Sequence, residues 1–77
     1  MKNLTVYTSN GCQYCHALKD YLDENKVEYT ERNISEDMEA RKELMQKGHM
    51  GVPVTVIDGE TEIVGFDQEK IKEALGL

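Results

Sequence analysis

The chain has 77 residues, of which 39% are hydrophobic and 31% are charged, with a single proline. This length suits one domain spanning residues 1–77, and the composition is that of a folded protein rather than of a disordered segment. The net charge of −6 argues against a nucleic-acid partner, which would require a basic face.

The first predicted element is a β-strand over residues 2–7, where Leu4 and Val6 alternate with polar residues. The N-terminal segment has no apolar stretch long enough for a signal peptide or a membrane span. We therefore expect a cytoplasmic protein with no membrane association. In that compartment a C-x-x-C motif is more often catalytic or metal-binding than structural.

A helix is predicted over residues 13–25, directly after the first strand and a short loop. Its apolar stripe consists of four residues at helical spacing: Cys15, Leu18, Tyr21 and Leu22. Cys12 immediately precedes this helix, so its sulfur is expected where free N–H groups and the helix dipole favour a thiolate. Cys15 is close enough to form a disulfide with Cys12, and the chain contains no other cysteine.

The next two predicted elements are an edge strand over residues 27–33 and a second helix. The residues of the strand alternate along the chain, and one face carries enough charge to suggest the edge of a sheet. Ser35 is predicted to cap the helix, which should run to residue 47 and end at Gly48. The inward face of this helix is predicted to comprise Met38, the stem of Arg41, Leu44 and Met45.

A β-hairpin is predicted from residues 53–57 and 61–64, which flank the turn dipeptide Asp58 and Gly59. Asp67 is predicted to cap a last helix. The apolar side of this helix comprises Ile71, Ala74 and Leu75.

The predicted order is therefore β-α-β-α-β-β-α. A right-handed crossover makes the first two strands parallel, and the hairpin adds an antiparallel pair. The sequence thus predicts an α/β fold with a four-stranded mixed sheet and helices on both faces. The cysteine pair is expected just beyond the carboxyl end of the first strand.

The spacing of the two cysteines indicates thiol–disulfide redox chemistry. As a structural staple they would close a loop of only four residues, which the chain-entropy model rates at about 2 kcal/mol. Cys12 is the predicted nucleophile, and a lowered pKa would chiefly make it a better leaving group when a mixed disulfide is resolved. Cys15 is expected to attack Cys12 and release the reduced product.

Two other functions stay open from the residues alone. In a metal or iron–sulfur carrier, Cys12 and Cys15 would supply half of a tetrahedral site and need further ligands from His16, another subunit or external thiols. No metal site is predicted within the chain itself. The second alternative is a docking module without redox activity. Roles for His16 and His49 are not determined by the sequence.

Three segments resemble the glutaredoxins of the thioredoxin superfamily. Residues 12–16, Cys-Gln-Tyr-Cys-His, are similar to the family's Cys-Pro-Tyr-Cys-His, with Gln13 in place of proline. Residues 51–53, Gly-Val-Pro, match its Thr-Val-Pro except at the first position. Residues 65–67, Gly-Phe-Asp, resemble its Gly-Gly-x-Asp turn before the last helix. Together with the order of elements, the resemblance spans essentially the whole chain.

Residues 15–17, Cys-His-Ala, and the Gly-Phe pair at residues 65–66 are also similar to NrdH-type redoxins, the glutaredoxin-like electron donors of ribonucleotide reductase. The resemblance implies the thioredoxin-like (glutaredoxin) fold and a thiol–disulfide oxidoreductase that acts on protein or small-molecule disulfides. It further implies disulfide-containing protein partners, ribonucleotide reductase among them. We expect a monomer with no bound cofactor.

The resemblance also assigns substrate-binding positions. It implies that Pro53 follows a cis peptide bond beside the cysteine pair, although cis bonds occur at only about 5–6% of X–Pro positions in folded proteins. It implies that the backbone of Val52 hydrogen-bonds an extended thiol substrate. The remaining positions carried over by the motifs are Gln13, Tyr14, Gly65, Phe66 and Asp67.

Two reductants are compatible with the resemblance: glutathione and a flavoprotein of the thioredoxin-reductase type. Glutaredoxins bind glutathione through the Val-Pro backbone, nearby basic residues and the Gly-Gly turn. Here Val64 takes the first of those glycine positions, and residues 8–11 include no lysine. Fewer cations would hold the carboxylates of glutathione less firmly. The Arg-Pro that follows Gly-Phe in NrdH-type redoxins is absent, with Asp67 and Gln68 in its place.

Overall fold

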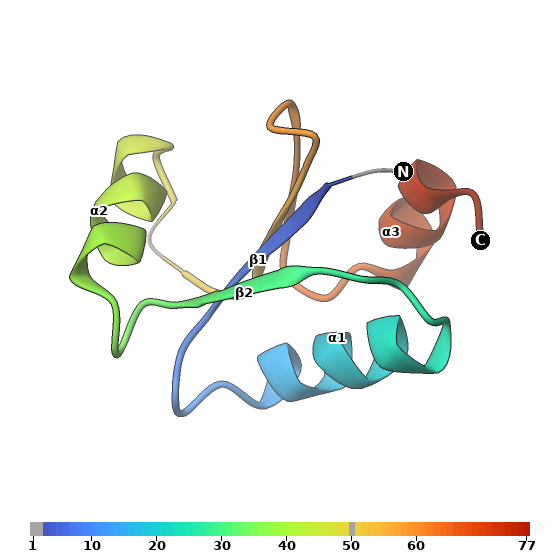
Figure 1. Cartoon of the computed structure of the whole chain (residues 1–77), viewed down its shortest axis with the longest axis horizontal. Helices are drawn as coiled ribbons and strands as arrows, with labels where there is room; N and C mark the ends of the chain where they lie inside the picture. Colours follow the sequence, from blue (N-terminus) through green and yellow to red (C-terminus); the bar gives the residue numbers. More distant parts are fainter. Residues whose placement is uncertain (1–2, 50) are drawn as a thin grey trace.

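The computed structural model describes residues 3–49 and 51–77 (Figure 1). The described elements follow the predicted order β-α-β-α-β-β-α. They are β1 (Leu4–Thr8), α1 (Gln13–Glu24), β2 (Thr30–Asn33), α2 (Met38–Gln46), β3 (Val54–Ile57), β4 (Thr61–Val64) and α3 (Gln68–Leu75).

The four strands form one mixed sheet in the order β2-β1-β3-β4. β1 runs parallel to β2 and antiparallel to β3, and β3 is antiparallel to β4. The register places Tyr7 of β1 between Arg32 of β2 and Val54 of β3. The predicted parallel pair, hairpin and mixed sheet are all confirmed.

Helices cover both faces of the sheet, as predicted, and Figure 1 shows α2 lying apart from α1 and α3. On one face α1 and α3 pack against β1 and the hairpin, in a core cluster of Leu4, Val6, Leu18, Leu22, Ile57, Ile63 and Ile71. On the other face α2 packs against β1 and β3, in a cluster of Tyr7, Ala40, Leu44, Val54 and Val56. The alternation of strand side chains between the two faces separates the clusters.

The predicted start of α2 is wrong. The N-cap is Asp37, whose carboxylate accepts the backbone N–H groups of Glu39 and Ala40 at 3.0 and 3.2 Å. The hydroxyl oxygen of Ser35 instead accepts a hydrogen bond from the backbone N–H of Asn10, at 3.2 Å. In the sequence Ser-Glu-Asp at residues 35–37, both Ser35 and Asp37 are suitable N-caps. Ser35 is engaged by the distant Asn10, and Asp37 caps the helix.

The predicted inward face of α2 is correct only at Leu44. Met38 and Met45 are 74% and 59% exposed, and Arg41 is exposed as well. Ala40 and Leu44 are the two buried residues of the helix. The small side chain of Ala40 lets α2 approach the sheet, so the buried stripe follows residues 40 and 44 rather than the methionines.

The edge strand β2 begins at Thr30, three residues later than predicted. The chain is still completing the turn after α1, since Lys26 has a φ of 57° and the N–H of Val27 donates to the carbonyl of Leu22 at 2.9 Å. Val27 and Tyr29 pack on the core from this turn. The alternation seen in the sequence therefore reflects partly buried loop residues as well as a strand.

The hairpin turn and the last helix form as predicted. Asp58 and Gly59 have φ values of 54° and 73°, which suit the left-handed turn that two-residue hairpin dipeptides adopt. Asp67 caps α3, its carboxylate accepting the backbone N–H of Lys70 at 3.2 Å. This cap fixes the direction of the chain as it leaves β4.

Candidate active site

The sheet brings four chain segments together at one end. β1 ends at Thr8 and continues into the loop before Cys12, while β2 ends beside it, since the N–H of Ile34 donates to the carbonyl of Thr8 at 2.8 Å. β3 begins at this same end, because Val54 pairs with Tyr7 and Pro53 directly precedes Val54. The turn after β4 joins them through a hydrogen bond from the N–H of Gly65 to the carbonyl of Pro53, at 2.8 Å.

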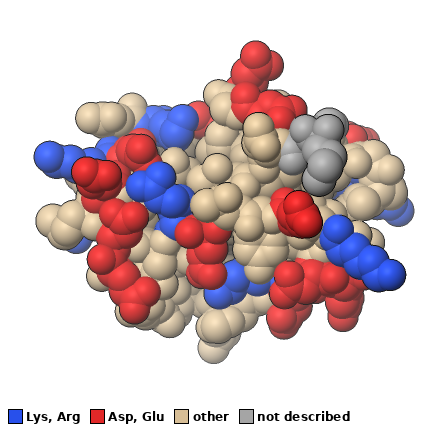
Figure 2. Space-filling view, viewed as in Figure 1, with Lys and Arg blue, Asp and Glu red and all other residues tan. Residues whose placement is uncertain are grey.

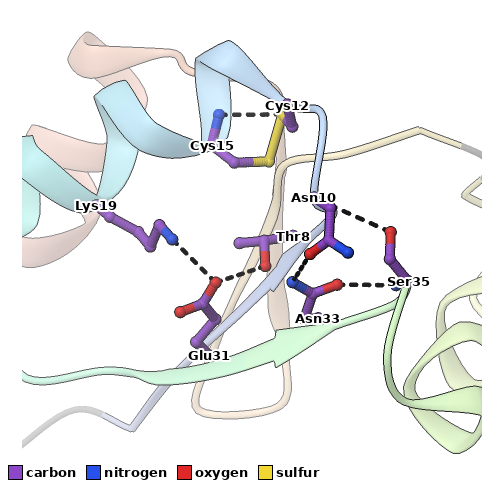
Figure 3. Close-up of polar contacts among 8 residues, drawn as sticks. All are labelled: Thr8, Asn10, Cys12, Cys15, Lys19, Glu31, Asn33 and Ser35. Atoms are coloured by element: carbon purple, nitrogen blue, oxygen red, sulfur yellow. Dashed lines mark hydrogen bonds and ion pairs between the residues drawn. A yellow bond between two sulfur atoms is a disulfide. The ribbon is translucent and has the colours of Figure 1, made fainter.

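Cys12 and Cys15 form a disulfide at the N-terminus of α1, with Cα atoms 5.2 Å apart (Figure 3). Cys12 is the N-cap of the helix, and its sulfur accepts the backbone N–H of Cys15 at 3.0 Å. Cys12 is partly exposed, whereas Cys15 is only 1% exposed. The predicted placement of Cys12 at a helix N-terminus is confirmed, and the two cysteines differ in their exposure to solvent.

Two hydrogen bonds attach the loop before Cys12 to the end of β2, and a third supports them from within the β2 end. The side-chain amide of Asn33 donates to Asn10 Oδ1 at 2.8 Å, and the backbone N–H of Asn10 donates to Ser35 Oγ. The backbone N–H of Ser35 donates in turn to Asn33 Oδ1 at 2.8 Å. Figure 3 shows these three side chains facing one another below Cys12. Asn10 lies in the loop before Cys12, whereas Asn33 and Ser35 lie at and just after the end of β2, so the sequence pattern did not indicate their contact.

A second polar group joins β1, β2 and α1 next to the cysteine pair. The buried hydroxyl of Thr8 donates to Glu31 Oε2 at 2.7 Å, and Lys19 Nζ lies 3.0 Å from the same oxygen (Figure 3). These two contacts lower the pKa of the Glu31 carboxyl below its ordinary value, with the hydrogen bond from Thr8 as the largest cause. Lys19 is therefore already paired with a carboxylate of the protein itself.

The peptide bond between Val52 and Pro53 is cis, as the resemblance implied. Pro53 is fully buried, and the side chain of Val52 packs against the core cluster around α2. Among residues 3–49 and 51–77, neither the N–H nor the carbonyl of Val52 has a hydrogen-bond partner. The backbone of Val52 is thus available to another molecule.

The other predicted substrate-binding residues differ in their surroundings. Gln13 and Tyr14 lie in the first turn of α1 beside the disulfide, and Tyr14 is 70% exposed. Phe66 is half-buried, with its ring edge-on to Tyr21 at a centroid distance of 5.9 Å. Asp67 is engaged as the cap of α3. Gln13 and Tyr14 can therefore contact a partner directly, whereas Phe66 and Asp67 shape the turn that follows β4.

The two histidines lie in different surroundings. His16 is exposed on α1, next to Cys15 in the chain. His49 is hydrogen-bonded through Nε2 to Glu62 of β4. In the part of the chain that the structure describes, no three His, Cys, Asp or Glu side chains are grouped so that they could hold a metal ion. None of the described helices is long and apolar enough to cross a membrane.

The sequence model of the glutaredoxin family matches residues 4–62. This chain belongs to the glutaredoxin family. The match includes the cysteine pair, the Val52–Pro53 bond and three of the four strands in full. This glutaredoxin-family protein is a thiol–disulfide oxidoreductase, in line with the disulfide at the end of its sheet.

Relatives of this glutaredoxin-like protein include short bacterial redoxins. It is 32% identical over 73 residues to a glutaredoxin-like 8.6 kDa protein of the Clostridium pasteurianum rubredoxin operon, covering 94% of this chain and 96% of that protein. It is also 32% identical over 68 residues to the glutaredoxin-like protein NrdH of Escherichia coli, covering 88% of this chain and 83% of that protein.

Solved structures agree with these sequence matches. The fold matches the NrdH-redoxin of Escherichia coli with a TM-score of 0.83 and 28% identity, covering 92% of each chain. It matches a variant of the thioredoxin-like protein BC3987 with a TM-score of 0.86 and 34% identity, covering 94% of this chain and 97% of the other. Both the predicted family and the predicted thioredoxin-like fold are thereby confirmed.

The lowered pKa of Glu31 predicts a pH-dependent contribution to stability. The ionised carboxylate stabilises the fold above its unfolded pKa, and the contribution is lost as the pH falls through the lower folded pKa. Glu31→Gln should therefore lower the free energy of unfolding near neutral pH. We expect a loss on the order of 0.5 kcal/mol, because the Glu31 side chain is 35% exposed and exposed pairs contribute little.

The difference between wild type and Glu31→Gln should shrink as the pH falls to about 2, where the wild-type carboxyl is also protonated. Urea unfolding at a series of pH values measures it. Glu36→Gln is a matched control, because it removes the same charge from an exposed carboxylate with no hydrogen-bond or ion-pair partner among the described residues. An equal loss for Glu31→Gln at both ends of the pH series would contradict the assignment.

Proposed function

We propose that this protein carries two electrons from a dithiol reductant to the disulfides of other proteins, by cycling between a Cys12/Cys15 dithiol and the disulfide. The observation that supports this most directly is the pairing of a partly exposed cysteine at a helix N-terminus with a cysteine that is only 1% exposed. One sulfur is accessible to a substrate, and the other is accessible only to the first.

In the proposed first step, the Cys12 thiolate attacks one sulfur of the substrate disulfide. The substrate S–S bond breaks, a mixed disulfide with Cys12 forms, and the other substrate sulfur leaves as a thiolate that takes up a proton. The N–H of Cys15, which points at Cys12 Sγ, and the N-terminal dipole of α1 would stabilise the attacking anion. No basic side chain is needed for this role.

In the second step, Cys15 loses its proton and attacks Cys12 Sγ. The bond between Cys12 and the substrate breaks, and the second substrate sulfur leaves and is protonated. The substrate has then gained two electrons and two protons, and the protein is left with the Cys12–Cys15 disulfide seen in the structure. A low pKa makes Cys12 a good leaving group when the oxidised protein is reduced again.

We propose that the substrate docks as an extended segment beside the disulfide. The free N–H and carbonyl of Val52 would pair with its backbone, as strands do when a chain adds to a sheet. Tyr14 and Gln13 would contact its side chains from the first turn of α1. The segment from Gly65 to Asp67, held by the hydrogen bond to Pro53, would form the far rim of the site.

We further propose a flavoprotein dithiol, rather than glutathione, as the reductant. Two lysines of the described chain are already paired with carboxylates of the protein, Lys19 with Glu31 and Lys47 with Glu62. Val64, at a glycine position of the glutathione turn, has an exposed side chain. The face in Figure 2 carries many acidic side chains and no continuous basic patch, and the net charge is −6. Such a surface offers little to the carboxylates of glutathione.

The relatives support the same choice. The solved structure of the Escherichia coli NrdH-redoxin is described as the basis of a thioredoxin-like activity profile in a glutaredoxin-like protein. We accordingly propose that the protein acts as a single-domain monomer in the cytoplasm without a bound cofactor. Its disulfide substrates would include a ribonucleotide reductase.

Separate serine substitutions test the roles of the two cysteines. Cys12→Ser should abolish reduction of a protein disulfide such as that of insulin, because the hydroxyl is not ionised near neutral pH. Cys15→Ser should allow the first attack and accumulate a mixed disulfide through Cys12, detectable by mass spectrometry. Far-ultraviolet circular dichroism controls for folding. The mechanism is wrong if Cys12→Ser retains wild-type turnover or if Cys15→Ser forms no mixed disulfide with the substrate.

The reductant is tested by supplying NADPH with two alternative couples. We expect the oxidised protein to be reduced much faster by thioredoxin reductase than by glutathione with glutathione reductase, because paired lysines and Val64 disfavour glutathione binding. NADPH consumption measures both rates, and a dithiol glutaredoxin is the control for the glutathione couple. Faster turnover with glutathione would overturn this assignment of the reductant.

A further inference from the structure

The segment that carries Val52 leaves the C-terminus of α2 and reaches β3 at Val54. Its beginning is fixed by helix-terminal hydrogen bonds, from the N–H of Gly48 to Met45 and from the N–H of His49 to Leu44. Its end is fixed at Pro53, whose carbonyl accepts the N–H of Gly65. Between these points the side chain of Val52 packs on the core cluster around α2, but its backbone has no hydrogen-bond partner within the described chain. The contacts at the two ends therefore add to this packing in orienting the backbone of Val52.

Glu62 of β4 contacts this segment from the side. One carboxylate oxygen accepts a hydrogen bond from His49 Nε2, and the other lies 3.7 Å from Lys47 Nζ. The two contacts lower the pKa of the Glu62 carboxyl, with the hydrogen bond from His49 as the largest cause. One carboxylate thus holds two residues of the segment that leads into Val52.

The sheet gives Glu62 a fixed position. Glu62 lies opposite Val56 in the register of β3 and β4, and its neighbour Ile63 is buried in the core. The hairpin therefore does not need the ion pair in order to stay in place. Residues 47–49 and residues 51–53 gain more from the contacts with this hairpin, because Glu62 holds the first group and Gly65 the second.

We propose that Glu62 is a positioning residue for the binding of protein disulfides. By holding His49 and Lys47, it sets the orientation of the free backbone groups of Val52 that receive the substrate. This inference rests on the proposed function, because it assumes that an extended substrate pairs with Val52. It concerns substrate binding and leaves the chemistry at Cys12 unchanged.

The test compares Glu62→Ala, His49→Ala and the double variant in steady-state reduction of insulin by the thioredoxin-reductase couple. His49→Ala should raise KM about threefold with kcat unchanged, the size expected when one exposed charge-assisted contact is lost. Glu62→Ala also loses the contact with Lys47 and should raise KM at least as much. The double variant should be no worse than Glu62→Ala, because His49 acts through Glu62. Additive losses would overturn the proposal.

Glu60→Ala is the matched control, since Glu60 lies in the same hairpin. Its exposed carboxylate has no hydrogen-bond or ion-pair partner among the described residues. It should leave KM at the wild-type value. A small aromatic disulfide, which has no backbone to pair with Val52, should be reduced equally well by wild type and all variants. An equal loss on the small disulfide would show a general structural role and overturn the proposal.

The same measurements separate failure of this inference from failure of the proposed function. If the wild-type protein reduces insulin and the Glu62 and His49 variants keep its KM, the positioning role is wrong and the proposed function stands. If the wild-type protein reduces the small disulfide but not insulin with either reductant, the proposed function is wrong, and the positioning role that rests on it is wrong with it.

Discussion

The contact between Cys12 Sγ and the backbone N–H of Cys15, 3.0 Å long, is the interaction on which the rest of the site depends. It exists because β1 ends four residues before Cys12 and α1 begins directly after it. A sulfur in the N-cap position faces unpaired N–H groups and the positive end of the helix dipole, both of which favour negative charge. The same geometry buries Cys15 one turn below, so the two cysteines differ in their exposure to solvent.

The surrounding polar contacts hold that geometry from the neighbouring strands. Asn33 ties the loop before Cys12 to the end of β2, and Glu31 connects Thr8 at the end of β1 with Lys19 on α1. The Glu31 carboxylate also pairs with Lys19, so this lysine is not a free cation beside the site. We propose that a redox protein built in this way relies on backbone hydrogen bonds to stabilise the thiolate and to bind the substrate. Under this proposal, partners that present an extended chain are favoured over a small anionic thiol.

Most of the fold and the cysteine site could be predicted from the sequence, because they depend on local patterns. The alternating strands, the hairpin dipeptide and the N-capping Asp67 can each be recognised from a few consecutive residues. The cis bond before Pro53 followed from the family resemblance. The errors arose where distant residues compete for the same group: Ser35 bonds Asn10 instead of capping α2. The supports of the site, such as Glu31 with Thr8 and Glu62 with His49, lie on separate elements and have no local sequence signal.

Titration of the Cys12 thiol in the reduced protein tests the central claim most directly. The ultraviolet absorbance of the thiolate, followed against pH and assigned with Cys15→Ser, gives its pKa. The N-cap geometry predicts a value well below the roughly 8.5 of an unperturbed cysteine, with Cys12 largely ionised at neutral pH. A Cys12 thiol that stays protonated up to or beyond that value would contradict the account.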